Sequence, residues 1–319
     1  MEIWYLMILT FILTFLILNW LINYQKRNRV GQIEREEGLR SHKEKNKTPI
    51  FGGVAFVLSY LIVFTFLLII DEINIYIYLL IVMPMTSFSL LGFIDDYLIL
   101  KYKKNEGIKP NIKFLIQIII STLFFIIYLI LNFDTTINLF FITIDLKFLY
   151  GIFILLAFSG FTNATNLTDG VDGLLAGTFS FILIGLFLIT GNSDIRNLIT
   201  IIFSGICAFL YFNLPKAKIF MGDTGSLAIG SLFVSLLVIL KLEVFLFIFG
   251  LVYVLETLSV MLQVAYFKYS KGKRIFKMSP LHHHFEIVFN SEIKTLILFY
   301  LFTITTVICG VLLFINYMR

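Results

Sequence analysis

The chain has 319 residues, of which 59% are hydrophobic, 17% aromatic and only 14% charged, and its mean hydropathy is +0.94. This composition excludes a soluble globular domain, because the repeated apolar stretches are long enough to cross a bilayer. The formal net charge is +5 at pH 7. The basic residues of the chain gather in the loops on one side of the predicted membrane. The positive charge therefore reflects membrane topology and argues against nucleic-acid binding.

Ten membrane-spanning helices are predicted, so the expected fold is an all-α, polytopic integral membrane protein. The predicted spans are residues 3–23, 51–70, 75–94, 113–131, 147–162, 174–190, 197–213, 227–241, 244–267 and 293–317. No basic residue precedes the first span, which is too long for a signal-peptide core, so we expect a retained helix. Trp4 and Trp20 flank it as interface anchors do. Without repeats or low-complexity linkers, residues 1–319 are expected to form a single domain.

The distribution of basic residues predicts the orientation. With both termini outside, the loops 24–50, 95–112, 163–173, 214–226 and 268–292 face the cytoplasm. Of the 25 lysine and arginine residues, all but Lys147, Arg196, Lys241 and Arg319 lie in or beside these loops. Cytoplasmic loops carry such an excess, so the asymmetry indicates the inner face. A basic inner face also attracts anionic lipid headgroups and phosphorylated substrates.

Three acidic, glycine-punctuated segments fall on this same side, although they were not used to choose the orientation. They are Gly92-Phe93-Ile94-Asp95-Asp96, residues 163–174 with the sequence NATNLTDGVDGL, and Gly222-Asp223-Thr224-Gly225-Ser226. Polar residues at this density beside membrane spans are costly and mark functional sites. We therefore expect the three segments to converge on one site that binds a cation and a phosphate.

The adjacent carboxylates of Asp95 and Asp96 repel each other at the end of the third span. A divalent cation or a nearby ammonium, such as that of Lys113, relieves this repulsion. The alternative reading is a solvated helix cap that pairs with the following lysines.

In residues 163–174, Asn163, Asn166, Asp169 and Asp172 recur every three positions. On a helical turn these positions drift slowly around one face, so that several oxygens point at one polar cleft. A capped helix start is the alternative, and it explains one aspartate but hardly four polar residues.

The third segment has glycines on both sides of Asp223-Thr224 and then opens an apolar helix. Backbone amides at such a helix start hold phosphate oxygens, while Asp223 holds a hard cation. As a helix cap alone, Asp223 or Ser226 would be unremarkable.

Three of the four histidines are consecutive, His282-His283-His284. Consecutive histidines cannot easily present three nitrogens to one tetrahedral zinc ion, so contact with phosphate or sugar is the favoured reading. Glu256 and Gln263 share a face of the ninth span, which predicts a polar helix contact for Glu256 or the rim of the site.

The order GFIDDY, NATNLTDGVDGL, FMGDTGSL and SPLHHHFE on ten spans resembles the polyprenyl-phosphate N-acetylhexosamine-1-phosphate transferases. Within that superfamily, HHHFE, ETLSVMLQV at 256–264 and KRIFKMSP at 273–280 look like the phospho-N-acetylmuramoyl-pentapeptide transferases. The resemblance extends from Lys45 to beyond Glu286. One departure is Ile50, where the family usually has a second threonine that helps form the nucleotide pocket.

The resemblance implies an Mg²⁺-dependent enzyme that transfers phospho-MurNAc-pentapeptide from UDP to undecaprenyl phosphate. It implies a bacterial plasma-membrane location with the active site on the cytoplasmic face. By analogy, Asp95 is a base or a nucleophile, Asp96 and Lys113 position phosphate, and Asp223 with Asn166 binds magnesium. The remaining substrate contacts implied are Lys45, Asn163, Asp169, Gly170, Asp172, Asn213, Phe220, Gln263, His282, His283 and His284. A homodimer is left open.

Two other functions compete with this reading. A sister transferase would load GlcNAc-1-phosphate onto the same lipid, and the SPLHHHFE segment argues against it. An ion-coupled transporter would also carry intramembrane carboxylates. The transporter is disfavoured because the polar residues gather at one interface and not at the midplane.

Overall fold

The computed structural model describes residues 3–29, 31, 48–102 and 107–317. Its elements are α1 (Ile3–Asn28), α2 (Gly52–Ile69), α3 (Ile75–Tyr102), α4 (Pro110–Ile130), β1 (Thr136–Asn138), β2 (Thr143–Asp145), α5 (Leu149–Thr168), α6 (Leu174–Ile189), α7 (Ser193–Asn213), α8 (Gly222–Ile239), α9 (Phe245–Phe249), α10 (Leu251–Tyr269), α11 (Leu281–Phe289) and α12 (Glu292–Tyr317).

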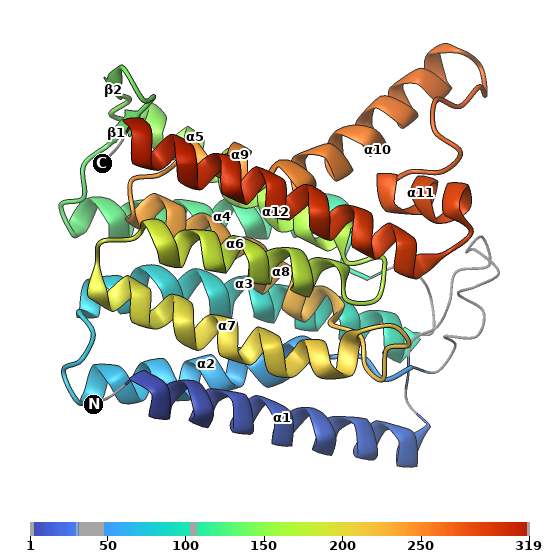
Figure 1. Cartoon of the computed structure of the whole chain (residues 1–319), viewed down its shortest axis with the longest axis horizontal. Helices are drawn as coiled ribbons and strands as arrows, with labels where there is room; N and C mark the ends of the chain where they lie inside the picture. Colours follow the sequence, from blue (N-terminus) through green and yellow to red (C-terminus); the bar gives the residue numbers. More distant parts are fainter. Residues whose placement is uncertain (1–2, 30, 32–47, 103–106, 318–319) are drawn as a thin grey trace.

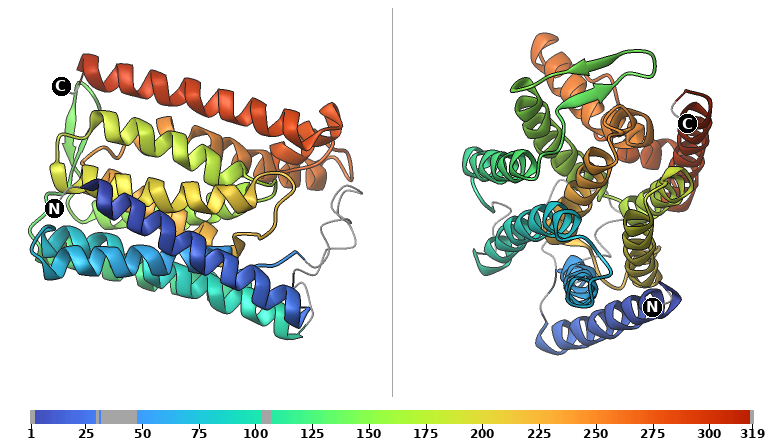
Figure 2. Two further views of the ribbon diagram at one scale, coloured as in Figure 1. Left: turned by 60° about the horizontal axis from the view of Figure 1, so that its bottom comes forward. Right: turned by 90° about the vertical axis from the view of Figure 1, so that its left-hand side faces the viewer.

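The long helices run alongside one another as a bundle (Figures 1 and 2). Among the described residues, nine helices are long and apolar enough to cross a membrane. The expected span at 174–190 is α6, whose 16 residues fall short of the ~20 that a perpendicular crossing needs. Both ends of the chain lie at the same end of the bundle (Figure 1), as an even number of crossings requires. The polytopic helical fold is therefore confirmed.

Several span boundaries differ from the prediction: α5 continues to Thr168 instead of ending at residue 162, and α8 begins at Gly222 instead of at residue 227. The third span was expected to end at residue 94, but α3 continues to Tyr102, so Asp95 and Asp96 lie within a helix. The ninth span was expected as one helix, but it breaks at Gly250 into α9 and α10. After this break, α10 leaves the bundle at an angle, and α11 packs below it beside α12 (Figure 1).

The central helix is α8, which is 89% buried over its apolar window, against 28% for α1 and α12. Small residues let its neighbours approach its backbone closely. A Cβ on Gly92 of α3 would lie 2.1 Å from the carbonyl oxygen of Asp223, and one on Gly53 of α2 would lie 2.3 Å from the Cα of Gly225. This contact places the carboxylates of α3 beside the first turn of α8.

At the end of the bundle that holds the termini, β1 and β2 form an antiparallel hairpin (Figure 2). A polar cluster beside it joins two helices to a turn: the buried carboxylate of Glu243 accepts a hydrogen bond from Tyr150 at 2.6 Å and pairs with Lys241 at 3.0 Å. Tyr128 donates to the backbone carbonyl of Asp134 at 2.7 Å. The C-terminal end of α4, the N-terminal end of α5 and the α8–α9 turn are thereby fixed together.

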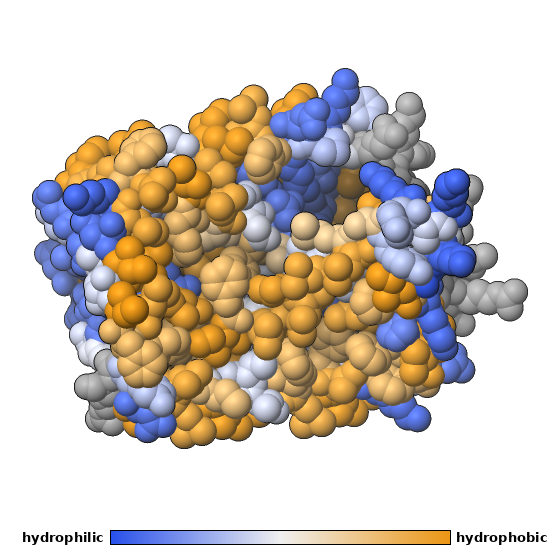
Figure 3. Space-filling view, turned by 90° about the horizontal axis from the view of Figure 1, so that it is seen from above, coloured by the Kyte–Doolittle hydropathy of each residue, from blue (hydrophilic) through white to orange (hydrophobic). Residues whose placement is uncertain are grey.

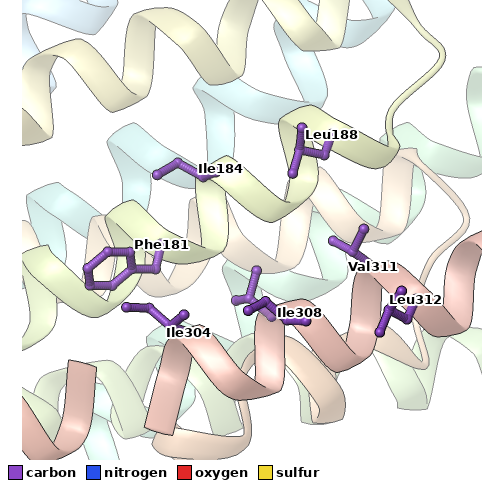
Figure 4. A pocket seen from close by; sticks show the side chains of 8 residues that line it. Phe181, Ile184, Leu188, Ile304, Ile308, Val311 and Leu312 are labelled. Carbon is purple, nitrogen blue, oxygen red and sulfur yellow. The ribbon is translucent and has the colours of Figure 1, made fainter. Parts of the chain in front are cut away.

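The surface is that of a protein in a bilayer. Hydrophobic residues cover the middle of the face in Figure 3, hydrophilic residues gather at its two ends, and a hollow lined with hydrophilic residues opens in this face. An apolar cavity of about 220 Å³ lies between α6 and α12 (Figure 4). Its lining is Phe181, Ile184, Leu188, Ile304, Val307, Ile308, Val311 and Leu312, which offers no catalytic group.

Candidate active site

The first contact of the site joins Asp96 to the start of α8. Its Oδ1 accepts the backbone N–H of Asp223 at 3.0 Å, and its Oδ2 accepts the backbone N–H and the hydroxyl of Thr224 at 3.0 and 2.7 Å. These N–H groups have no partner within the helix, so a carboxylate there stabilises the helix start. Gly222 permits the contact: its φ is +74°, and a Cβ would lie 2.5 Å from Oδ2 of Asp96. Asp96 thereby fixes the position of Asp223.

A second contact joins two carboxylates through one ammonium. Nζ of Lys113, on α4, lies 2.5 Å from Oδ2 of Asp223 and 3.5 Å from Oδ2 of Asp95. The other oxygen of Asp95 accepts the backbone N–H of Ile108 at 2.7 Å. Lys113 therefore lies between Asp95 and Asp223, on three different helices, and not between Asp95 and Asp96 as the sequence suggested, because Asp96 is bound instead by the start of α8.

These three side chains line a cavity of about 340 Å³. Its walls are Asp95, Ile99, Gly107, Ile108, Pro110, Lys113, Phe114, Gln117, Asn163, Asn166 and Asp223. The cavity joins apolar side chains to charged ones, which suits a lipid that carries a phosphate.

Gln117 lies one helical turn beyond Lys113 and was not among the residues predicted from the sequence. Its Oε1 accepts a hydrogen bond from Asn163 at 3.0 Å, and its buried Nε2 has no partner. A signal was present in the sequence: Lys113 and Gln117 are polar residues four positions apart on a largely apolar helix, so they share one face.

The 163–174 segment is the end of α5 followed by a turn, and it meets α8. The hydroxyl of Thr165 donates to the backbone carbonyl of Ser226 at 2.9 Å. The side-chain amide of Asn166 donates to Oγ of Ser226 at 3.1 Å. This bond from the amide nitrogen fixes the orientation of the Asn166 side chain and leaves its Oδ1 as the atom that can bind a ligand. The carboxylate of Asp169 makes no hydrogen bond or ion pair with the described residues. Burial, and then the charge of Asp223, raise the pKa of Asp169 well above its ordinary value.

The α7–α8 connection packs against this turn. Asp172 accepts the N–H of Ala217 at 2.9 Å, and Asn213 accepts the N–H of Gly173 at 3.0 Å. Phe220 pairs through its backbone with Pro49 at 2.8 Å, on the segment that enters α2. These residues form a second wall of the site, whereas Lys45 lies outside the described residues.

The three histidines do not share a centre. The ring of His282 lies 3.1 Å from Glu256, His283 lies 3.5 Å from Glu286, and Nδ1 of His284 accepts the N–H of Lys277 at 3.1 Å. Within the described residues, the three rings therefore do not form a group arranged to hold a zinc ion. His282 reaches the site, because a Cβ on Gly170 would lie 2.2 Å from its Nε2.

Gln263 holds the loop before the histidines. Its Oε1 accepts the N–H groups of Ile275 and Phe276 at 3.0 Å, and its Nε2 donates to the carbonyl of Phe276 at 3.1 Å. Its amide is occupied by this loop, so its predicted contact with substrate remains a prediction.

The oxygen donors of the cavity fit a magnesium ion. No group of three or more histidine, cysteine, aspartate or glutamate side chains in the described part of the chain is arranged to hold a metal. Mg²⁺ does not need such a group, since one or two carboxylates, substrate phosphates and water complete its octahedron. Asp223, with Oδ1 of Asn166, supplies hard ligands of the required kind.

Comparison with known proteins gives consistent matches. The family model "Glycosyl transferase family 4" matches residues 76–241, from α3 to the end of α8. Phospho-N-acetylmuramoyl-pentapeptide-transferases of Staphylococcus aureus strains MSSA476 and MW2 are each 45% identical over 305 residues, which cover 92% of this chain and 93% of the relative. The protein of that name from strain JH9 is 44% identical over 303 residues, with the same coverage.

Proposed function

The chain belongs to glycosyl transferase family 4 and, within it, to the phospho-N-acetylmuramoyl-pentapeptide-transferases, and from this premise we propose its reaction. It transfers phospho-MurNAc-pentapeptide from UDP-MurNAc-pentapeptide to undecaprenyl phosphate. The products are lipid I and UMP. The chain is thus a phosphosugar transferase that acts between a nucleotide sugar and a membrane lipid.

The observation that carries this proposal is the cavity shared by Asp95, Lys113 and Asp223. Two phosphates must approach each other in the reaction, and their repulsion has to be neutralised. In this partly apolar cavity, Lys113 provides a cation for the phosphates. Asp95 beside it provides a carboxylate that accepts a proton.

In the proposed reaction, Asp95 removes the proton from the lipid phosphate. The freed phosphate oxygen attacks the phosphorus attached to the sugar, and the bond to the UMP oxygen breaks. In a two-step variant, Asp95 itself attacks that phosphorus and the lipid displaces it. Release of UMP without undecaprenyl phosphate in a single-turnover experiment supports the two-step variant, and its absence supports the one-step reaction.

We propose that Asp223 and Asn166 hold Mg²⁺. When bound, the ion neutralises charge on the diphosphate and orients it. Asp96 keeps Asp223 at the start of α8, and Lys113 binds phosphate after it exchanges its carboxylate partner for the substrate.

We propose that the nucleotide and sugar are bound by the second wall together with the other substrate contacts that the resemblance implies. The proposed contacts are Lys45, Asn163, Asp169, Gly170, Asp172, Asn213, Phe220, Gln263 and His282 to His284. Ile50, where the family usually has a threonine, is 6% exposed, and its backbone N–H and carbonyl both bind the side chain of Gln25.

We place the protein in the bacterial plasma membrane with this site on the cytoplasmic side. The support is the gathering of basic residues in the loops at the site end of the bundle. A soluble nucleotide sugar then reaches the site from the compartment where such donors are made.

Product analysis tests the proposal. Purified protein with undecaprenyl phosphate and Mg²⁺ is given UDP-MurNAc-pentapeptide or UDP-GlcNAc in parallel. We expect lipid I and UMP from the muramoyl donor and far less product from UDP-GlcNAc. Turnover of UDP-GlcNAc alone would assign the chain to the sister transferases.

A further inference from the structure

Glu256 is a buried carboxylate on α10 that lies away from the cavity of Asp95 and Asp223. It is 0% exposed, and both of its oxygens bind one residue, His282, at the start of α11. Oε1 accepts the backbone N–H of His282 at 3.1 Å, and Oε2 lies 3.1 Å from Nδ1 of its ring. The carboxylate thus determines both the position of the backbone and the orientation of the ring.

This pairing determines which ring nitrogen carries hydrogen. The carboxylate form of Glu256 has only acceptor oxygens, and in that form Nδ1 is the donor to Oε2. The other ring nitrogen, Nε2, is then the one that faces the 163–174 turn.

The environment of Nε2 is unusual within the described part of the chain. His282 is 1% exposed, and its Nε2 has no hydrogen-bond partner. The nitrogen abuts Gly170, where a Cβ would lie 2.2 Å away. An unpaired buried N–H is rarer in proteins than an unpaired acceptor, so a lone pair on Nε2 fits this position better than a hydrogen.

We propose that Glu256 is a positioning residue for the donor substrate: it holds His282 with Nδ1–H toward α10 and presents Nε2 as an acceptor to the nucleotide sugar. The group that Nε2 binds is a hydroxyl or an amide N–H of that donor. The inference rests on the proposed function, since the donor is the ligand that enters beside Gly170.

A Glu256→Gln variant tests the orientation without removing the backbone contact. The amide oxygen of glutamine still accepts the N–H of His282, but its NH₂ group donates to Nδ1. The ring hydrogen must then move to Nε2, which no longer accepts. A role limited to joining α10 to α11 would be preserved in this variant.

Two measurements report the result. The ¹⁵N spectrum of histidine-labelled protein, assigned with a His282→Gln sample, should show hydrogen on Nδ1 in the wild type and on Nε2 in Glu256→Gln. The KM for the UDP-linked donor should rise about tenfold, with little change in kcat or in the KM for undecaprenyl phosphate. Glu243→Gln, a buried carboxylate at the other end of the bundle, is the matched control and should keep the donor KM.

A second variant does not depend on the folding of the first. Gly170→Ala displaces the ring from the opposite side and should raise the donor KM in the same way. A donor KM within about twofold of wild type in either variant, or hydrogen remaining on Nδ1 in Glu256→Gln, overturns the proposal. The spectrum reports the orientation of the His282 ring and does not depend on catalytic activity. A wild-type protein that makes no lipid I would refute the proposed function without affecting this result.

Discussion

Nζ of Lys113 lies 2.5 Å from Oδ2 of Asp223, although the two residues are 110 positions apart in the chain. The ammonium occupies the side of Asp223 that faces the cavity, where we propose that magnesium binds. In the proposed reaction, lysine and metal would therefore compete for one carboxylate, and binding of the lysine to a substrate phosphate would free that carboxylate for the metal.

Replacing Lys113 by glutamine should make folding stability depend on magnesium. Without the ammonium, the carboxylates of Asp95 and Asp223 repel each other, so the Tm in EDTA should fall. Added Mg²⁺ should raise the Tm of Lys113→Gln more than that of the wild type, as measured in a thermal shift assay.

Lys241→Gln serves as the control, because Lys241 pairs with Glu243 at the other end of the bundle. Its Tm should not respond to Mg²⁺ more than the wild type does. An equal magnesium response in Lys113→Gln and Lys241→Gln would argue against a metal at Asp223.

Asp95→Asn and Asp223→Asn should each lower kcat by about two to four orders of magnitude while the protein stays folded in detergent. The changes remove the proposed base and the proposed metal ligand but keep the side-chain shape. Raised Mg²⁺ should partly restore Asp223→Asn and not Asp95→Asn. Asp194→Asn, on α7 far from the cavity, should keep normal turnover, and a well-folded, fully active Asp223→Asn would remove that residue from the mechanism.

Asp96→Asn should lower the Tm as well as the activity. This loss of stability distinguishes it from Asp223→Asn, which should lower activity alone. An asparagine offers one acceptor oxygen and directs its NH₂ group at N–H donors, so at least one hydrogen bond worth about 1.5–3 kcal/mol is lost. We expect a clear fall in Tm on thermal unfolding. Thr224→Val, which removes only the hydroxyl bond to Asp96, should show a smaller fall. A Tm equal to that of Asp223→Asn would contradict the helix-capping role.

Single cysteines test the membrane topology in a background that lacks Cys207 and Cys309. Cysteines at Lys216 and Lys271 should react with impermeant thiol reagents only from the cytoplasmic side, and one at Asn192 only from the outside. Labelling of Lys216 and Lys271 from opposite sides would be incompatible with a common site for Asp223 and His282.

The sequence alone predicted the membrane fold well, because bilayer crossing depends on the length and hydropathy of local segments. Its boundaries were less accurate where the packing of neighbouring helices extends or interrupts a helix. Asp95 and Asp96 belong to α3 because that helix continues against α8 beyond the apolar stretch. The break at Gly250, which sends α10 away from the bundle, has no hydropathy signal at all.

The sequence also predicted that the three acidic segments meet, and the contacts from Asp96 to Asp223 and from Asn166 to Ser226 confirm it. Which residue of these segments faces the cavity and which supports the helix start was decided by the tertiary structure. Asp95 and Asp96 are equivalent as neighbours in the chain, but successive helical positions point about 100° apart, so one faces the cavity and the other the start of α8. Likewise, Glu256 acquires its partner only because α11 returns to α10. Composition and charge asymmetry are properties of the chain, whereas the partner of each buried charge is set by which helices pack together.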